Sequence, residues 1–205
     1  AESWQTVHGD RWEGRLGGVY GHLAIIAEKN GTRSVPIELL DEPGLARVAD
    51  YLQGRAAAAP AWSHSSSRVG KALRGRLQVL RNGRLVAFDP GTRPEPEIYL
   101  AYFGAEWCGP CKRFSPTLVS AYEQLKRAAG DRFELVFISS DRDTAEQLAY
   151  VRQVGMPWPV LKFSAVGSVE PIERWQGRGI PNLIALTPGG DVLLHSYRGD
   201  EYLGP

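Results

Sequence analysis

The sequence predicts an α/β domain that follows a small, mostly β module. One observation is an apolar, aromatic-rich run at 97–103, which is followed by a long segment with apolar residues at three- and four-residue steps. Another is the continuous apolar run at 133–138, typical of a central strand covered on both faces. A third is the series of short β-type runs in residues 1–53. Strand and helix patterns therefore alternate only in the second part of the chain.

The β-type runs of residues 1–53 are separated by Gly17-Gly18 and by a turn at 29–31, which indicates a small barrel-like module. Two interpretations of this module remain open. It is either a solubility or docking appendage, or it holds a ligand or peptide in a pocket built from Trp4, Trp12 and Tyr20.

Residues 54–70 are rich in alanine and serine and lack a hydrophobic period, so we expect a flexible linker before a domain at 71–205. Asn82-Gly83 predicts the turn of a β-hairpin between about 73 and 88. Seven basic residues and no acidic residue lie between Gln53 and Asp89. They raise the alternative of a nucleic-acid patch, but their alternation with apolar residues favours the outer face of a strand pair. We therefore expect no nucleic-acid partner.

The two cysteines of the chain, Cys108 and Cys111, lie in the segment Trp-Cys-Gly-Pro-Cys, between the predicted strand and the predicted helix. A thiol at a helix N-terminus is close to unpaired backbone N–H groups, and Lys112 and Arg113 add positive charge. Such surroundings lower a cysteine pKa from about 8.5 to roughly 3.5–7.5. Cys108 is therefore the predicted nucleophile. Cys111 is the predicted resolving thiol, which closes an intramolecular disulfide.

Pro110 suits the first turn of the helix, where its missing N–H costs no hydrogen bond. Several further segments carry a family resemblance: Ala105 to Lys112, Pro116, Tyr102 to Ala105, Met156 to Trp158, and Gly179 to Pro181. Together they resemble the thioredoxin-like superfamily, and they are most similar to its tryparedoxin and nucleoredoxin types, over about residues 71–203. The first 53 residues resemble the Sla-type homology modules.

The resemblance implies a central mixed sheet flanked by helices and a protein-disulfide oxidoreductase activity. It implies that Pro181 is a cis-proline that faces the cysteine pair and contacts the substrate backbone. It also makes Trp107, Gly109 and Pro110, together with Gly179 and Ile180, candidates for substrate binding. Trp158 is a further candidate contact, although a core tryptophan would have the same pattern in the sequence.

The sequence departs from the thioredoxin pattern at Tyr102, where thioredoxins have a buried aspartate that is thought to accept the proton of the resolving thiol. Glu106 and water remain the candidate acceptors for Cys111, and Glu106 is also a candidate for tuning the thiolate. The Gly-Pro spacer between the cysteines is that of thioredoxins and favours a reducing potential. Thioredoxin has a potential of about −270 mV, against about −120 mV for a strong oxidant.

The 205-residue chain has a formal net charge of +1, which gives no general attraction to nucleic acids or acidic lipids. It contains no run of the roughly 20 apolar residues that a membrane helix needs. A zinc site needs four ligands, and the four histidines are scattered singly, so we expect no metal. No nucleotide fingerprint is present, so we expect no cofactor other than the cysteine pair, with protein disulfides as substrates and a dithiol protein as electron donor.

Two questions stay open in the sequence. The chain begins with Ala1 and contains a single methionine, Met156, which favours an extracytoplasmic protein with its signal peptide removed, the alternative being cytoplasmic. The leading functional hypothesis is a disulfide reductase. The alternatives are a disulfide oxidase or isomerase, and a non-enzymatic envelope protein that binds a partner or captures metal.

Overall fold

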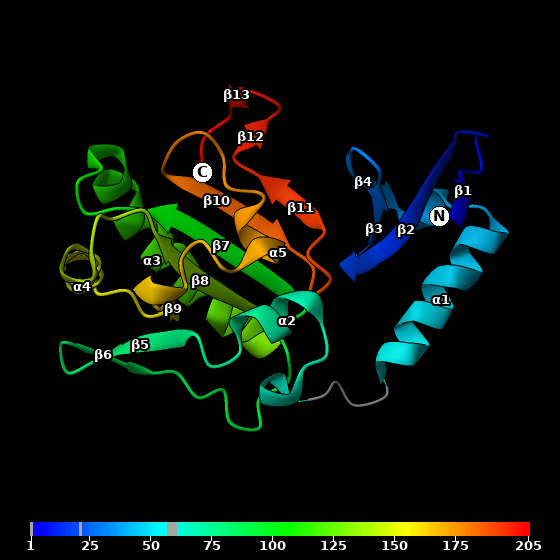
Figure 1. The fold of residues 1–205 in the computed structure, drawn as a ribbon. Helices are drawn as coiled ribbons and strands as arrows, with labels where there is room; N and C mark the ends of the chain where they lie inside the picture. The colour runs from blue at the N-terminus through cyan, green and yellow to red at the C-terminus, as the bar shows by residue number, and fades with distance from the viewer. Residues whose placement is uncertain (1, 21, 57–60) are drawn as a thin grey trace. The chain divides into compact units, whose positions relative to one another are not determined.

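The computed structural model describes residues 2–20, 22–56 and 61–205, and Figure 1 shows how their helices and strands are arranged. The chain divides into two compact units. The first comprises residues 1–59 with 191–193, and the second comprises 60–190 with 194–205. Each unit has its own sheet.

The first unit contains the β-rich module that the sequence predicts. Its elements are β1 (Glu2–Gln5), β2 (Arg11–Tyr20), β3 (Leu23–Glu28), β4 (Gly31–Pro36), a short 3-10 helix (Ile37–Leu39) and α1 (Glu42–Ala56). The four strands pair antiparallel in chain order. An antiparallel bridge between Thr6 and Leu40 joins the chain after β1 to the chain after β4, in agreement with the expected barrel-like module. Two backbone hydrogen bonds flank this bridge, from the Val7 N–H to the Leu39 carbonyl and from the Asp41 N–H to the Gln5 carbonyl.

The indole of Trp4 forms the centre of the first unit's core. It is fully buried with Ile26 and Leu40, and its Nε1 donates to the Gly14 carbonyl. A Cβ atom at Gly14 would lie 2.4 Å from a methyl group of Ile26, so only glycine permits this approach. Trp4 therefore does not line a surface pocket, and the side chain of Tyr20 lies outside the described set.

The second unit is built on one mixed sheet of seven strands, in the order β11-β10-β7-β8-β9-β5-β6. Its strands are β5 (Leu77–Arg81), β6 (Arg84–Ala87), β7 (Ile98–Gly104), β8 (Phe133–Ser139), β9 (Val160–Leu161), β10 (Asn182–Leu186) and β11 (Val192–His195). The central strands β7 and β8 are parallel, and β10 pairs with β7 antiparallel. A separate small hairpin follows, formed by β12 (Tyr197–Arg198) and β13 (Glu201–Tyr202).

Helices cover both faces of this sheet. The long α3 (Gly109–Ala129) and α4 (Thr144–Val154) pack on the face that carries Tyr102 and Phe137. The short α2 (Arg68–Leu73) and α5 (Glu170–Glu173) lie in front of the sheet in Figure 1. Of the helices in the described ranges, none is long and apolar enough to cross a membrane.

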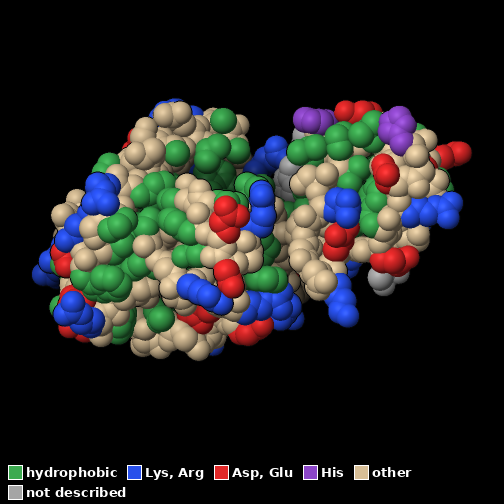
Figure 2. Space-filling view, turned by 90° about the horizontal axis from the view of Figure 1, so that it is seen from above, with side chains coloured by type: hydrophobic (Ala, Val, Ile, Leu, Met, Phe, Trp, Pro, Cys, Tyr) green, Lys and Arg blue, Asp and Glu red, His purple; other side chains and the backbone are tan. Residues whose placement is uncertain are grey.

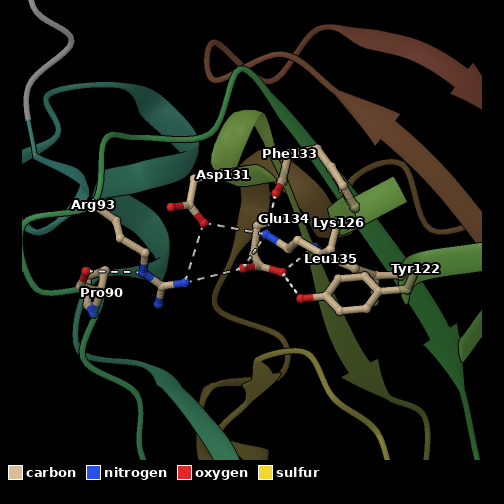
Figure 3. Close-up of polar contacts among 8 residues, drawn as sticks. All are labelled: Pro90, Arg93, Tyr122, Lys126, Asp131, Phe133, Glu134 and Leu135. Carbon is tan, nitrogen blue, oxygen red and sulfur yellow. Dashed lines mark hydrogen bonds and ion pairs between the residues drawn. The ribbon is translucent and has the colours of Figure 1, made fainter. Parts of the chain in front are cut away.

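The C-terminal turn of α3 is fixed to the start of β8 by a buried carboxylate, that of Glu134 (Figure 3). Glu134 accepts the Tyr122 hydroxyl at 2.8 Å and the backbone N–H of Leu135 at 3.0 Å. The Lys126 ammonium lies 3.2 Å from the same carboxylate and also donates to the Phe133 carbonyl at 2.8 Å. The guanidinium of Arg93 approaches Glu134 within 3.9 Å. The carboxylate thus holds helix, strand and preceding loop together.

The predicted linker at 54–70 is wrong for the part that the structure describes. α1 extends through Ala56, a 3-10 helix spans Trp62–His64, and α2 begins at Arg68, while residues 57–60 lie outside the described set. Trp62 is only 4% exposed and packs edge-on against Phe88 and Tyr99. The serines that suggested flexibility are bonded instead, because the hydroxyls of Ser65 and Ser67 both donate to the carboxylate of Glu95.

The hairpin of β5 and β6 is confirmed, with Asn82 and Gly83 both at positive φ in its turn. Several basic residues of this region are engaged within the fold. Arg68 pairs with Glu170, and Arg76 donates to the Ser168 carbonyl. On the face that Figure 2 shows, basic and acidic side chains are interspersed.

Candidate functional site

The cysteine pair lies at the junction between β7 and α3. β7 ends at Gly104, Cys108 is the N-cap residue of α3, and Cys111 lies in the first turn. The two residues form a disulfide bond. The Sγ atom of Cys108 accepts the backbone N–H of Cys111 at 3.1 Å. A sulfur in this position takes the place of the oxygen of a usual capping side chain, and a negative charge on it is favoured by the helix dipole.

The two sulfurs differ in their surroundings. Cys111 is fully buried, and Cys108 is 4% exposed. The residues next to them are open to solvent: Trp107 is 50% exposed, and Gly109 and Pro110 are exposed. The Trp107 indole is oriented by a hydrogen bond, which its Nε1 donates to the Ser140 carbonyl at 3.3 Å. An exposed, largely apolar surface therefore borders the sulfur pair.

The loop at 179–181 faces the same sulfur. The Ile180–Pro181 peptide bond is cis, and the carbonyl oxygen of Ile180 lies 3.7 Å from the Sγ atom of Cys108. The sheet explains this proximity, since β10 begins directly after Pro181 and its first residue, Asn182, pairs with Phe103 at the end of β7. Segments about 70 residues apart in sequence are thus brought together.

The three residues expected to tune the thiolate also lie here, but they act differently from one another. Lys112 forms an ion pair with Glu106, so part of its charge is neutralised locally. The exposed guanidinium of Arg113 lies beside Gly109, 3.7 Å from the position of a Cβ atom there. Among the described residues, Arg113 forms no ion pair with a carboxylate, so its charge is not neutralised locally, and the helix N-terminus adds to its effect on Cys108.

Asp141 supports this site and was not identified from the sequence. Its carboxylate accepts the backbone N–H of Glu106 at 2.6 Å and the hydroxyl of Ser139 at 2.6 Å. Burial raises the pKa of Asp141, and these two hydrogen bonds oppose the rise. The sequence contained a signal for the position of Asp141. Asp141 follows strand β8, and the carboxyl ends of the neighbouring parallel strands β7 and β8 lie at the same edge of the sheet.

A buried group of three hydroxyls, which we call the hydroxyl triangle, lies behind Cys111 and consists of Tyr102, Ser115 and Tyr150. Ser115 Oγ lies 3.0 Å from the Tyr102 oxygen and 2.6 Å from the Tyr150 oxygen, and the two tyrosine oxygens are 3.0 Å apart. Ser115 also donates to the Cys111 carbonyl at 2.9 Å. Burial raises the pKa of the Tyr102 phenol far above its ordinary value. Tyr102 therefore stays protonated and does not replace the ionised aspartate of thioredoxins.

The expected partner contact at Trp158 is wrong. Trp158 is fully buried, and its ring meets that of Tyr122 edge-on at 5.3 Å between centroids. The preceding Met156 is also buried, at 2% exposure. The segment that breaks the helix pattern therefore turns its large side chains into the core, away from solvent.

Comparisons with known proteins agree with this architecture. Residues 96–192 match the sequence model of the thioredoxin-like family. This chain belongs to the thioredoxin-like family through its second unit. Among the described residues, no three His, Cys, Asp or Glu side chains gather in a way that could hold a metal ion.

Similar proteins include nucleoredoxins and tryparedoxins. The chain is 41% identical over 99 residues to probable nucleoredoxin 1 of Arabidopsis thaliana, which covers 48% of this chain and 17% of that protein. It is 36% identical over 130 residues to nucleoredoxin of Bos taurus, covering 63% of this chain and 27% of that protein. The match thus spans little more than a quarter of these relatives at most. Tryparedoxin from Trypanosoma brucei has a similar structure, with a TM-score of 0.48 and 27% identity over 63% of this chain and 86% of that one.

The extracytoplasmic location expected from Ala1 is wrong on this comparison. The nucleoredoxin relatives are intracellular, in the nucleus or cytoplasm. Of the two locations that the sequence left open, the cytoplasmic one therefore agrees better with these relatives. A small first residue is a weak signal, because any trimmed chain can begin with one.

Proposed function

We propose that this protein is a protein-disulfide reductase that works by thiol-disulfide exchange through Cys108 and Cys111. The observation that carries the proposal is the position of the Cys108 sulfur, which accepts a helix N-terminal N–H and lies 3.7 Å from the Ile180 carbonyl beside the cis-proline. Membership of the thioredoxin-like family and the similarity to nucleoredoxins support the same chemistry.

The proposed cycle has two exchange steps. The Cys108 thiolate attacks one sulfur of a protein disulfide, so that a mixed disulfide forms and the other substrate sulfur leaves as a thiolate. Cys111 then loses its proton to Glu106 or water, and its sulfur attacks that of Cys108. The Cys108–Cys111 disulfide forms, and the second substrate sulfur leaves. Two electrons pass from the pair to the substrate, and a dithiol protein returns them by the reverse exchange.

The residues around the pair receive roles in this proposal. Trp107, Gly109 and Pro110 form one side of the substrate surface, and the loop from Gly179 to Pro181 forms the other. Arg113 and the helix N-terminus favour the Cys108 thiolate, while the pairing of Lys112 with Glu106 lowers the contribution of Lys112. The cysteine pair itself carries the electrons, with no other cofactor.

The test is the reduction of insulin disulfides by dithiothreitol, measured for the wild type and two matched serine variants. We expect Cys108→Ser to abolish turnover and to form no mixed disulfide. Cys111→Ser also loses turnover, but it accumulates a mixed disulfide on Cys108 that is visible by mass spectrometry. Insulin reduction by Cys108→Ser at the wild-type rate would refute the proposal.

The direction of electron flow is tested separately by equilibrating the pair with glutathione buffers. We expect a potential close to the roughly −270 mV of thioredoxin. A value between about −180 and −120 mV would indicate an oxidase or isomerase instead.

A further inference from the structure

The C-terminal hairpin of β12 and β13 packs against the loop that carries the cis-proline. The hairpin presents two tyrosines to the loop: Tyr197 on β12 and Tyr202 on β13, which are register partners with ring centroids 4.9 Å apart. We call these two residues the tyrosine clasp.

Tyr202 contacts the proline itself. Its hydroxyl donates to the Pro181 carbonyl at 2.7 Å, a bond between residues 21 apart in sequence. Burial and the neighbouring Tyr197 raise the pKa of the Tyr202 phenol, so the proton needed for this bond stays on the oxygen at neutral pH. The ring remains 46% exposed, so it also forms part of the surface beside the loop.

Tyr197 contacts the start of the same loop. A Cβ atom at Gly177 would lie 2.3 Å from the Tyr197 ring, and one at Gly179 would lie 3.0 Å from the Tyr197 hydroxyl. The ring thus lies directly against the backbone at both positions, and a larger residue at Gly177 would displace it.

The hairpin is itself anchored, so it can hold the loop in place. His195 lies between two backbone groups: its Nδ1 accepts the Tyr197 N–H at 2.9 Å, and its Nε2 is 2.7 Å from the Trp175 carbonyl. The hydroxyl of Ser196 bonds to both the N–H and the carbonyl of Leu183 in β10. Arg178 of the loop pairs with Asp200 in the hairpin turn at 2.8 Å.

We propose that Tyr202 is a positioning residue, which holds Pro181 and with it the Ile180 carbonyl beside Cys108 for docking of a polypeptide disulfide. This inference rests on the proposed function and names the substrate class on which Tyr202 acts. A polypeptide must pair with the loop backbone while its sulfur reaches Cys108. A small aromatic disulfide needs only the sulfur, so its reaction does not depend on the loop.

The test compares reduced wild type with Tyr202→Phe, which keeps the ring and removes the hydroxyl. The matched control is Tyr99→Phe, which removes another bonded tyrosine hydroxyl, the one that donates to Glu95. Each protein is mixed with insulin and, separately, with 5,5′-dithiobis(2-nitrobenzoic acid). For Tyr202→Phe we expect kcat/KM for insulin to fall about five-fold, mainly through KM, because one hydrogen bond is lost. The rate with the small disulfide stays within about two-fold, and Tyr99→Phe changes neither.

A second measurement is independent of activity. Hydrogen-deuterium exchange of the backbone amides at 177–180 and of Asn182 should be faster in Tyr202→Phe and unchanged in Tyr99→Phe. Equal rates with insulin for Tyr202→Phe and wild type, equal losses with both disulfides, or unchanged loop exchange would each overturn the inference. If wild type fails to reduce insulin, the proposed function fails, and the exchange comparison still decides whether Tyr202 holds the loop.

Discussion

Replacement of Ser115 by alanine tests whether the hydroxyl triangle stabilises the active-site helix. Ser115 is fully buried, and its hydroxyl contacts Tyr102, Tyr150 and the Cys111 carbonyl. In Ser115→Ala the two tyrosine hydroxyls, 3.0 Å apart, still bond to each other. One phenolic O–H is then left without an acceptor, at a cost of about 1–3 kcal/mol. Alanine offsets about 0.5 kcal/mol through its higher helix propensity.

The expected net effect of Ser115→Ala is a loss of about 1.5 kcal/mol in the free energy of unfolding, or about 3–6 °C in Tm. Urea unfolding followed by tryptophan fluorescence and circular dichroism measures it. The matched control is Ser120→Ala on the exposed face of the same helix, for which we expect a change within about 0.5 kcal/mol. If Ser115→Ala is as stable as Ser120→Ala, the hydroxyl triangle does not contribute to stability.

Three further variants test other groups. Burial raises the pKa of Asp141, so the folded state binds its proton more tightly than the unfolded chain. The stability of wild type relative to Asp141→Asn is therefore expected to fall as the pH rises above about 4, the ordinary pKa of an aspartate, and a rise would contradict the assignment. Glu134→Gln removes the buried negative charge that faces the partly buried Lys126 ammonium and is expected to lower the free energy of unfolding by about 2 kcal/mol, whereas exposed Glu123→Gln changes it little in the same urea titration. Trp158→Phe is expected to cost about 1–2 kcal/mol with insulin reduction unchanged, and a selective loss of activity would restore Trp158 as a partner contact.

The parts of the fold and site that follow from local patterns were predictable from the sequence. Cys108 lies between a strand pattern and a helix pattern, and this local order places it at a helix N-terminus independently of the rest of the chain. Asn82-Gly83 specifies its turn locally, since both residues adopt positive φ. The position of Pro181 beside the sulfur came from the family resemblance and not from the spacing of residues.

The parts that depend on distant partners were not predictable. The sequence around Trp158 would be the same whether its side chain is exposed or buried. Its burial depends on packing against Tyr122, which is distant in the sequence. The serines before α2 indicated a linker by composition, although their acceptor, Glu95, lies about 30 residues away. The hydroxyl triangle joins residues 13 to 48 apart, a distance at which no periodic pattern operates. The C-terminal hairpin is the exception, because Gly199-Asp200 is a local turn signal in the sequence.

The long helix α3 is held at both ends by different means. The Cys108 sulfur caps its first turn, and Lys126 in its last turn bonds to Phe133 and Glu134. Electron exchange alters only the first of these attachments. We therefore expect the backbone nuclear magnetic resonance spectra of the dithiol and disulfide forms to differ near the cap and to coincide near Lys126. Catalytic turnover would then need no hinge, and the protein would act as a rigid carrier whose two oxidation states present nearly the same outline to their partners.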